Sequence, residues 1–269
     1  MTNDLPSYKK PPVVETVCGV LFQELRDLHG VHLGLFWQRL KKQYCKNREL
    51  PPLVPVIEQF GDQQPVRLQL TDVPPLPRTW ILTESEDAII QLQRDRFIHN
   101  WKKVSPKDEY PRYTRVIRDF REHFSAFRNF VEEQELGSLV PLQYEMTYVN
   151  HIPQGDGWTS INDIGNIFPD FARNVSSKRF LPEPDQLNWR TSFCLPDQQG
   201  RLHIVIRHIR RAADSQPILL FELTARGFPK DSSSEAMWHW FDLAHVWIVK
   251  GFTDLTDADI RKRLWRQES

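Results

Sequence analysis

Charged and amide side chains recur at every second position in several stretches of this sequence that predict β-strands. Successive side chains of a strand point to opposite faces of a sheet, so this alternation separates a polar face from an apolar face. Carboxylates, amides and guanidinium groups form directional hydrogen bonds, and arginine makes planar two-point contacts. The polar set is Glu15, Gln91, Gln93, Glu145, Arg207, Glu222 and Arg226. We predict that it holds a small polar ligand or a protein partner; a solvated sheet surface without a ligand is the alternative.

One basic stretch suggests a different use of the chain, as a nucleic-acid-binding protein. It comprises Arg94, Arg96, Trp101, Lys102 and Lys103. Basic and aromatic side chains together hold single strands through phosphate contacts and base stacking. Against this, the chain carries 35 Lys and Arg and 35 Asp and Glu, a formal net charge of zero, whereas proteins held mainly by phosphate contacts usually show a basic excess. We therefore rank nucleic acid below a protein or small polar partner.

The motifs of common catalytic sites are absent from the sequence. There is no GxSxG elbow, no GxxxxGK[ST] loop and no GxGxxG fingerprint. His239, Asp242 and His245 fall at i, i+3 and i+6, a spacing that does not supply the i, i+4 histidines of a helical zinc site. We expect no catalytic residue, no metal and no cofactor, and a binding protein rather than an enzyme. A hydrolase or nuclease whose site is dispersed along the chain remains the alternative.

Cysteine usage and hydropathy indicate the compartment. Cys18, Cys45 and Cys194 share no CxxC spacing, so a disulfide framework is not expected. The first ten residues are polar and lack the apolar core of a secretion signal. No run approaches the roughly 18 apolar residues of a membrane span. We expect a soluble, cytoplasmic protein without a membrane partner, for which a homodimer is a compatible state.

The first half of the chain, residues 11–136, predicts a strand, a helix, three strands and a long helix. The first strand, Val13–Phe22, is rich in β-branched and aromatic residues, and a helix follows from Leu33 to Tyr44. The three strand-like stretches are Val66–Thr71, Trp80–Thr83 and Ala88–His99. The long helix is marked by an apolar stripe at intervals of three and four, formed by Ile117, Phe120, Phe124, Phe127 and Val131.

The second half, residues 137–269, repeats this order. A strand at Leu142–Ile152 is followed by a short helical stretch at Ile161–Phe171. Three more strands are predicted at Trp189–Leu195, Arg201–Arg211 and Pro217–Gly227. A final helix is capped within residues 232–234, where Ser234 can accept a hydrogen bond from a free amide, and it runs to Phe252.

Together these elements predict an α+β fold, with an antiparallel sheet backed by long helices. Residues 1–10 form a polar leader, and the two similar halves make one integrated unit by internal duplication. The order resembles the saddle of the TATA-box-binding protein, which implies a shared fold only, since fold does not fix function.

Several short segments are similar to recurring pieces of a sporadically distributed bacterial and archaeal protein family. They are Pro11–Glu15, residues 245–265, Asn100–Trp101, Tyr110–Tyr113 and Tyr148–Asn150. The resemblance covers nearly the whole chain and implies one integrated unit. It implies no catalytic residue, because the family carries no established biochemical activity. Patchy distribution is typical of accessory genes, so the resemblance also implies a role near defence or toxin–antitoxin systems.

Overall fold

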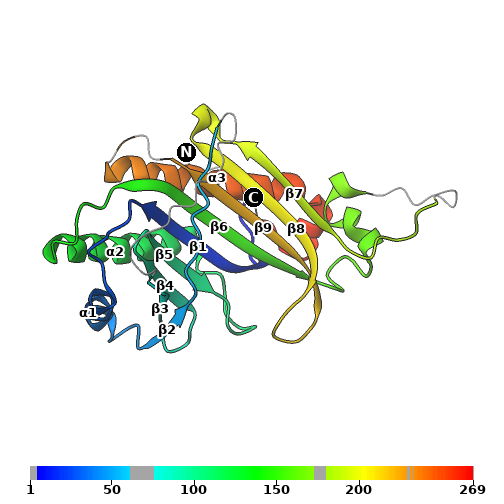
Figure 1. Ribbon diagram of the computed structural model, residues 1–269. Helices are drawn as coiled ribbons and strands as arrows, with labels where there is room; N and C mark the ends of the chain where they lie inside the picture. Colours follow the sequence, from blue (N-terminus) through cyan, green and yellow to red (C-terminus); the bar gives the residue numbers. More distant parts are fainter. Residues whose placement is uncertain (1–4, 61–75, 173–179, 229–230, 232, 269) are drawn as a thin grey trace.

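The computed structural model describes residues 5–60, 76–172, 180–228, 231 and 233–268. These residues form an α+β fold built on one antiparallel sheet (Figure 1). The sheet has nine strands. The strand order is β2-β3-β4-β5-β1-β6-β9-β8-β7, so β1 and β6 lie side by side in the middle. The long helices α2 and α3 cover one face of the sheet (Figure 1). The predicted fold class, an antiparallel sheet backed by helices, is confirmed at this level.

The first half contributes five strands and two helices. β1 and the long helix α2 agree with the prediction, whereas the predicted strand Ala88–His99 is wrong, since the chain turns back at Arg94–Asp95 and forms a hairpin. The strand β2 was not predicted, and the predicted strand Val66–Thr71 lies outside the described residues. The elements are β1 (Val13–Phe22), α1 (Gly30–Leu40), β2 (Lys46–Leu50), β3 (Arg78–Leu82), β4 (Ala88–Gln93), β5 (Arg96–Lys102) and α2 (Arg112–Glu133).

The second half follows its prediction more closely. Its four strands are confirmed, but the predicted helix at residues 161–171 consists of two short 3-10 segments separated before Pro169. The cap of α3 is Ser233 rather than Ser234, and its hydroxyl accepts from the Ala236 amide at 3.1 Å. The elements are β6 (Pro141–Pro153), η1 (Ile161–Asn166), η2 (Pro169–Phe171), β7 (Asn188–Cys194), η3 (Pro196–Gln198), β8 (Gly200–Arg210), β9 (Pro217–Gly227), α3 (Ser234–Leu255) and α4 (Ala258–Arg263).

The core lies between the sheet and the two long helices, and aromatic rings fill much of it. Phe97 of β5 contacts Phe124 and Phe127 of α2, with ring centroids 5.5 Å and 5.4 Å apart. Phe120 of α2 contacts Phe241 of α3 at 5.0 Å, which joins the two helices. One continuous cluster of buried side chains spans both halves of the chain. The helices are therefore fixed against one face, and the opposite face is left to other contacts.

The two ends of the described chain lie next to each other. The Lys9 amide donates to the Arg266 carbonyl at 3.1 Å, and the Glu268 amide donates to the Ser7 carbonyl at 2.9 Å. Tyr8 between them is buried, although it belongs to the segment assigned to a polar leader. None of the helices in the described ranges has the length and apolar character needed to cross a lipid bilayer.

Candidate functional site

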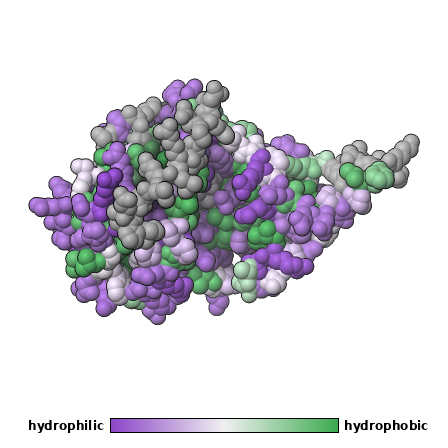
Figure 2. All heavy atoms as spheres, viewed as in Figure 1, coloured by the Kyte–Doolittle hydropathy of each residue, from purple (hydrophilic) through white to green (hydrophobic). Residues whose placement is uncertain are grey.

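The sheet face opposite α2 and α3, called here the open face, collects the polar side chains predicted from strand alternation. Residues paired across neighbouring strands share a face, so the register places Glu145, Arg226 and Gly19 on it together. The same register adds the rest of the predicted set, Glu15, Gln91, Gln93, Arg207 and Glu222. Figure 2 views the molecule from this side and shows hydrophilic and hydrophobic residues interspersed. The predicted residues therefore share one surface.

Two of the predicted charges neutralise each other. The Arg226 guanidinium lies 2.5 Å from the Glu145 carboxylate, and the two residues face each other across β9 and β6. Both side chains are partly exposed, so this ion pair contributes little to stability. Its effect is to orient two polar groups on the open face.

A chain of side-chain hydrogen bonds runs from β3 to β1 on the open face. Trp80 donates to Gln91 at 2.9 Å, and Gln91 donates to Asn100 at 2.7 Å. Asn100 then donates to the Glu15 carboxylate at 2.6 Å. Burial raises the pKa of Glu15 above its ordinary value, and the nearby charge of Glu222 raises it further. The hydrogen bond from Asn100 and the charge of Lys102 lower the pKa and offset part of this shift. The chain of bonds therefore fixes Glu15 in a setting that disfavours its negative charge.

Arg207 of β8 carries an unused hydrogen-bonding group. Its Nε atom is buried and meets no hydrogen-bond partner within the described ranges. It lies opposite Leu220 and Asn188 in the register, on the open face. Buried donors are normally satisfied, so Arg207 has capacity for a further contact.

A segment of the chain itself crosses the open face. Residues 51–60, called here the strap, follow β2 and pass in front of the sheet in Figure 1. The Leu53 amide donates to the Gln93 side chain at 2.8 Å, and the Gln93 amide group donates back to the Leu53 carbonyl at 3.3 Å. Gln143 accepts from the Glu58 amide at 2.7 Å and donates to the Val56 carbonyl at 2.8 Å. Two glutamine side chains therefore hold the main chain of the strap.

The strap ends in a buried carboxylate. Glu58 is 7% exposed, and its carboxylate accepts a hydrogen bond from Arg201 at 2.7 Å. The other oxygen of the carboxylate is hydrogen-bonded to Nε2 of His203. Arg201 also donates to the Gln59 carbonyl at 2.9 Å and lies 4.2 Å from the ring centre of Phe60. Burial raises the pKa of Glu58, but the bonds from His203 and Arg201 outweigh it and hold the pKa below its ordinary value. Glu58 is therefore a carboxylate stabilised by two basic side chains of β8.

Three of these residues are absent from the predicted site, namely Gln143, Arg201 and His203. Each alternates in phase with a predicted residue of its own strand, Gln143 with Glu145 and the other two with Arg207. Alternation could have found them. The strap itself gave no signal, because its prolines indicate only that the preceding element ends.

The basic stretch considered for nucleic acid does not form one patch. Arg94 is buried in the turn before β5 and donates to the Leu28 carbonyl at 3.0 Å. Arg96 makes two contacts of 3.0 Å with Asp95. Trp101 packs against Tyr110 on the helix side, whereas Lys102 faces Glu15 on the open face and Lys103 follows the end of β5. The structure thus divides these side chains between two faces and a turn.

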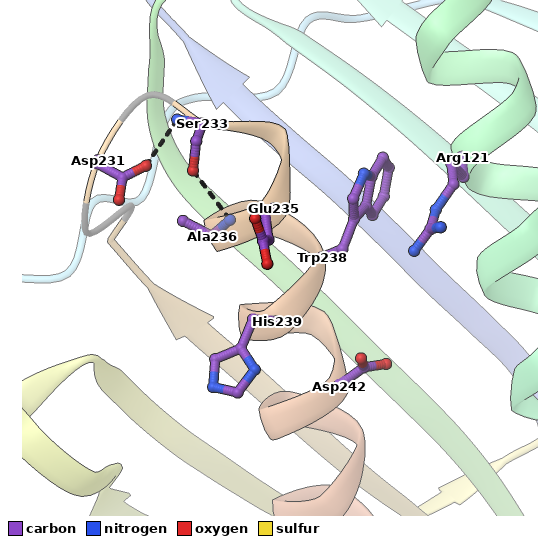
Figure 3. A pocket seen from close by; sticks show the side chains of 8 residues that line it. All are labelled: Arg121, Asp231, Ser233, Glu235, Ala236, Trp238, His239 and Asp242. Carbon is purple, nitrogen blue, oxygen red and sulfur yellow. Dashed lines mark hydrogen bonds between the residues drawn. The ribbon is translucent and has the colours of Figure 1, made fainter.

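A concave surface lies at the start of α3, away from the open face, and Figure 3 shows it from close by. This hollow has a volume of about 770 Å³ and lies between α3 and Arg121 of α2. The Arg121 guanidinium is 4.5 Å from the ring centre of Trp238, and Asp242 accepts from the Tyr113 hydroxyl at 2.6 Å. Figure 3 shows Trp238 pointing toward Arg121 and His239 pointing away from it. Arg121, Trp238 and Asp242 are engaged in these contacts, and His239 points away from Arg121, so these groups do not converge on one point.

Within the described ranges, no three His, Cys, Asp or Glu side chains come together in a group that could hold a metal ion. A scan against protein-family models gives no match to this chain, and a comparison with curated proteins gives none either.

Proposed function

We propose that the protein is a non-enzymatic binding protein, an adaptor, that holds a protein partner on the open face of its sheet. The observation that carries this proposal is the strap, because side chains of the open face hold its main chain through four amide contacts. A surface that holds one extended segment has the chemistry to hold another. A small polar ligand would use the same groups but fewer of them.

The charge distribution supports a protein partner over a polyanion. Glu15, Glu145 and Glu222 lie among Arg201, Arg207 and Arg226, so both signs alternate across the open face. Mixed charges steer and orient a complementary protein surface, whereas they repel part of a phosphate backbone.

The sheet topology supports the further proposal that the two halves arose by duplication, as in a saddle-like fold. β1 and β6 start the two halves and pair antiparallel in the middle of the sheet. The later strands of each half extend outward from them in opposite directions. A cytoplasmic location and an accessory role in a defence or toxin–antitoxin type system belong to the same proposal, and they rest on cysteine usage and the family resemblance.

Site-specific photo-cross-linking tests the proposal. A photoreactive amino acid at Val205, which lies opposite Glu222 on the open face, is expected to cross-link a partner in cells of the source organism. The same group at Arg118, an exposed position of α2, is the control and is expected to give no such product. Cross-links from Arg118 and none from Val205 would place the partner on the helix side and overturn the proposal.

A further inference from the structure

We infer that Gln93, Gln143, Arg201 and His203 form a binding track for an extended acidic segment of a partner protein, which displaces residues 53–60 from the same place. The inference rests on the proposed function, because it names the kind of segment that the open face takes and where that segment lies. We call these four side chains the track.

The contacts of the two glutamines do not depend on the side chains of the bound segment. A side-chain amide carries a donor and an acceptor, so one glutamine satisfies one backbone N–H and one backbone C=O. Gln93 does this at Leu53, and Gln143 does it at Val56 and Glu58. The side chains of Val54 and Val56 are 79% and 58% exposed, so they add little to the contact. Another extended segment can therefore replace the strap without matching these side chains.

The basic end of the track supplies the specificity. Among the strap residues that contact the track, Glu58 has a buried carboxylate, which lies between Arg201 and His203 of β8. Arg201 also lies over the ring of Phe60, which is two positions after Glu58 in the strap. Charge-assisted hydrogen bonds are the strong ones, and a cation over an aromatic ring adds to them. The track therefore favours an acidic residue followed two positions later by an aromatic one.

The strap acts on this site as a tethered competitor. Leu53 follows closely on the end of β2 at Leu50, so the strap is held near its own Gln93. This short connection favours a partner's segment over the strap of a second copy as the displacing occupant. A tethered segment has an effective concentration of about millimolar, so a free segment of equal affinity fills the track only above that concentration. The strap thus sets the affinity that a partner has to exceed.

The experiment uses the full-length protein and a fluorescent peptide with the sequence of residues 51–60, followed by fluorescence anisotropy. Glu58→Lys places a positive charge against Arg201 and is expected to release the strap. The peptide is then expected to bind the Glu58→Lys protein at least about tenfold more tightly than the wild-type protein. Adding Arg201→Ala to that variant, or replacing the peptide's acidic residue with glutamine, is expected to weaken binding by at least about tenfold.

The matched control is Glu49→Lys, which makes the same charge change at an exposed position of β2 outside the track. It is expected to bind the peptide as weakly as wild type. Circular dichroism and a cooperative thermal transition establish that Glu58→Lys is folded. A second measurement uses the wild-type protein alone: excess peptide is expected to accelerate hydrogen exchange at the amides of Leu53 and Glu58, as the strap leaves.

Equal peptide binding by the wild-type and Glu58→Lys proteins, or binding that ignores Arg201→Ala, would overturn the inference. A wild-type dimer that excess peptide dissociates would also overturn it, since the strap of a second copy would then be the occupant. Partner cross-linking from Val205 without any peptide binding would remove the track and leave the proposed function standing. Cross-links confined to Arg118 would remove both.

Discussion

Glu58 and Arg201 are 143 positions apart in the chain, and their charged groups lie 2.7 Å from each other. Glu58 is 7% exposed, so the contact is not a surface ion pair of small effect. A buried carboxylate requires charged or hydrogen-bonding partners, and Arg201 and His203 supply them. This pair fixes the end of the proline-rich connection over β8, while Gln93 and Gln143 hold its main chain.

Arg201→Ala is expected to loosen the strap while the rest of the fold persists. The substitution removes a charge-assisted hydrogen bond, which contributes about 1.5–3 kcal/mol. Hydrogen exchange at the amides of Leu53 and Glu58 measures the effect, because both amides are bonded to side chains of the open face. Arg207→Ala is the matched control, since Arg207 lies on the same strand and its buried Nε atom meets no hydrogen-bond partner among the described residues. Unchanged exchange in Arg201→Ala would contradict this role.

The docking of the strap is expected to depend on pH through Glu58. With the strap docked, the pKa of Glu58 lies below its ordinary value of 4.5. The docked state therefore binds fewer protons than the released state. Its contribution is therefore complete above pH 4.5 and is lost as the pH falls through the lower pKa of the docked state. The titratable and charged side chains facing Glu58 are Arg201 and His203, with the Arg226–Glu145 pair in the next positions of the register.

Nuclear magnetic resonance can follow this titration through the amide of Leu53, which reports docking at the far end of the strap. In Glu58→Gln the same amide is expected to show no transition in that range. A transition with its midpoint above pH 4.5 would mean that the pKa of Glu58 is raised instead.

Glu15→Gln is expected to stabilise the protein at pH 7. The pKa of Glu15 is raised in the folded state, so the folded protein binds more protons than the unfolded chain, and stability falls as the pH rises above the ordinary value of 4.5. Glutamine removes this penalty and keeps an oxygen that can accept from Asn100. Chemical unfolding at pH 7 and at pH 4 measures the difference, which is expected to shrink at the lower pH. Glu49 on β2 is exposed, so the control variant Glu49→Gln is expected to leave stability unchanged at both pH values. If Glu15→Gln instead destabilises the protein, the negative charge of Glu15 is needed for stability.

Phe120→Ala is expected to cost about 3–5 kcal/mol in the free energy of unfolding. Phe120 is fully buried and contacts Phe97 of the sheet and Phe241 of α3, so truncation leaves a cavity where three elements meet. Phe180→Ala provides the control, because that ring is 97% exposed and its loss is expected to change stability by less than about 0.5 kcal/mol. Similar values for the two variants would exclude a core at Phe120.

Strand alternation and helical periodicity were enough to predict most elements, because burial on one face imposes a period on the sequence. The apolar stripe of α2 through Phe120 and Phe124 shows this, since both residues are buried. The hairpin at Arg94–Asp95 is not predicted because its turn contains no glycine, proline or asparagine, and Asp95 alone between two arginines is a weak turn signal. Tertiary contacts decide it instead, as Arg94 reaches the Leu28 carbonyl.

The candidate site was predictable to a lesser degree. Alternation placed Glu15 and Glu222 on the open face, since register preserves the side of each residue. The strap was not predictable, because its position depends on Gln93, Gln143 and Arg201, which lie far from it in sequence and whose pairing no local pattern expresses.

Because β1 pairs with both β5 and β6, its two edges become covered at different times while the chain is being synthesised. A growing chain completes β5 well before β6, so one edge of β1 is covered early and the other waits for the second half of the protein. During that interval β1 offers unpaired backbone groups beside side chains such as Val20 and Phe22, which are buried in the finished fold. An exposed strand edge with apolar residues is a template for wrong pairing between nascent chains. The arrival of β6 (Pro141–Pro153) ends that vulnerability, so slow translation before β6 has left the ribosome is expected to increase aggregation, whereas slow translation after β6 has paired leaves β1 already protected.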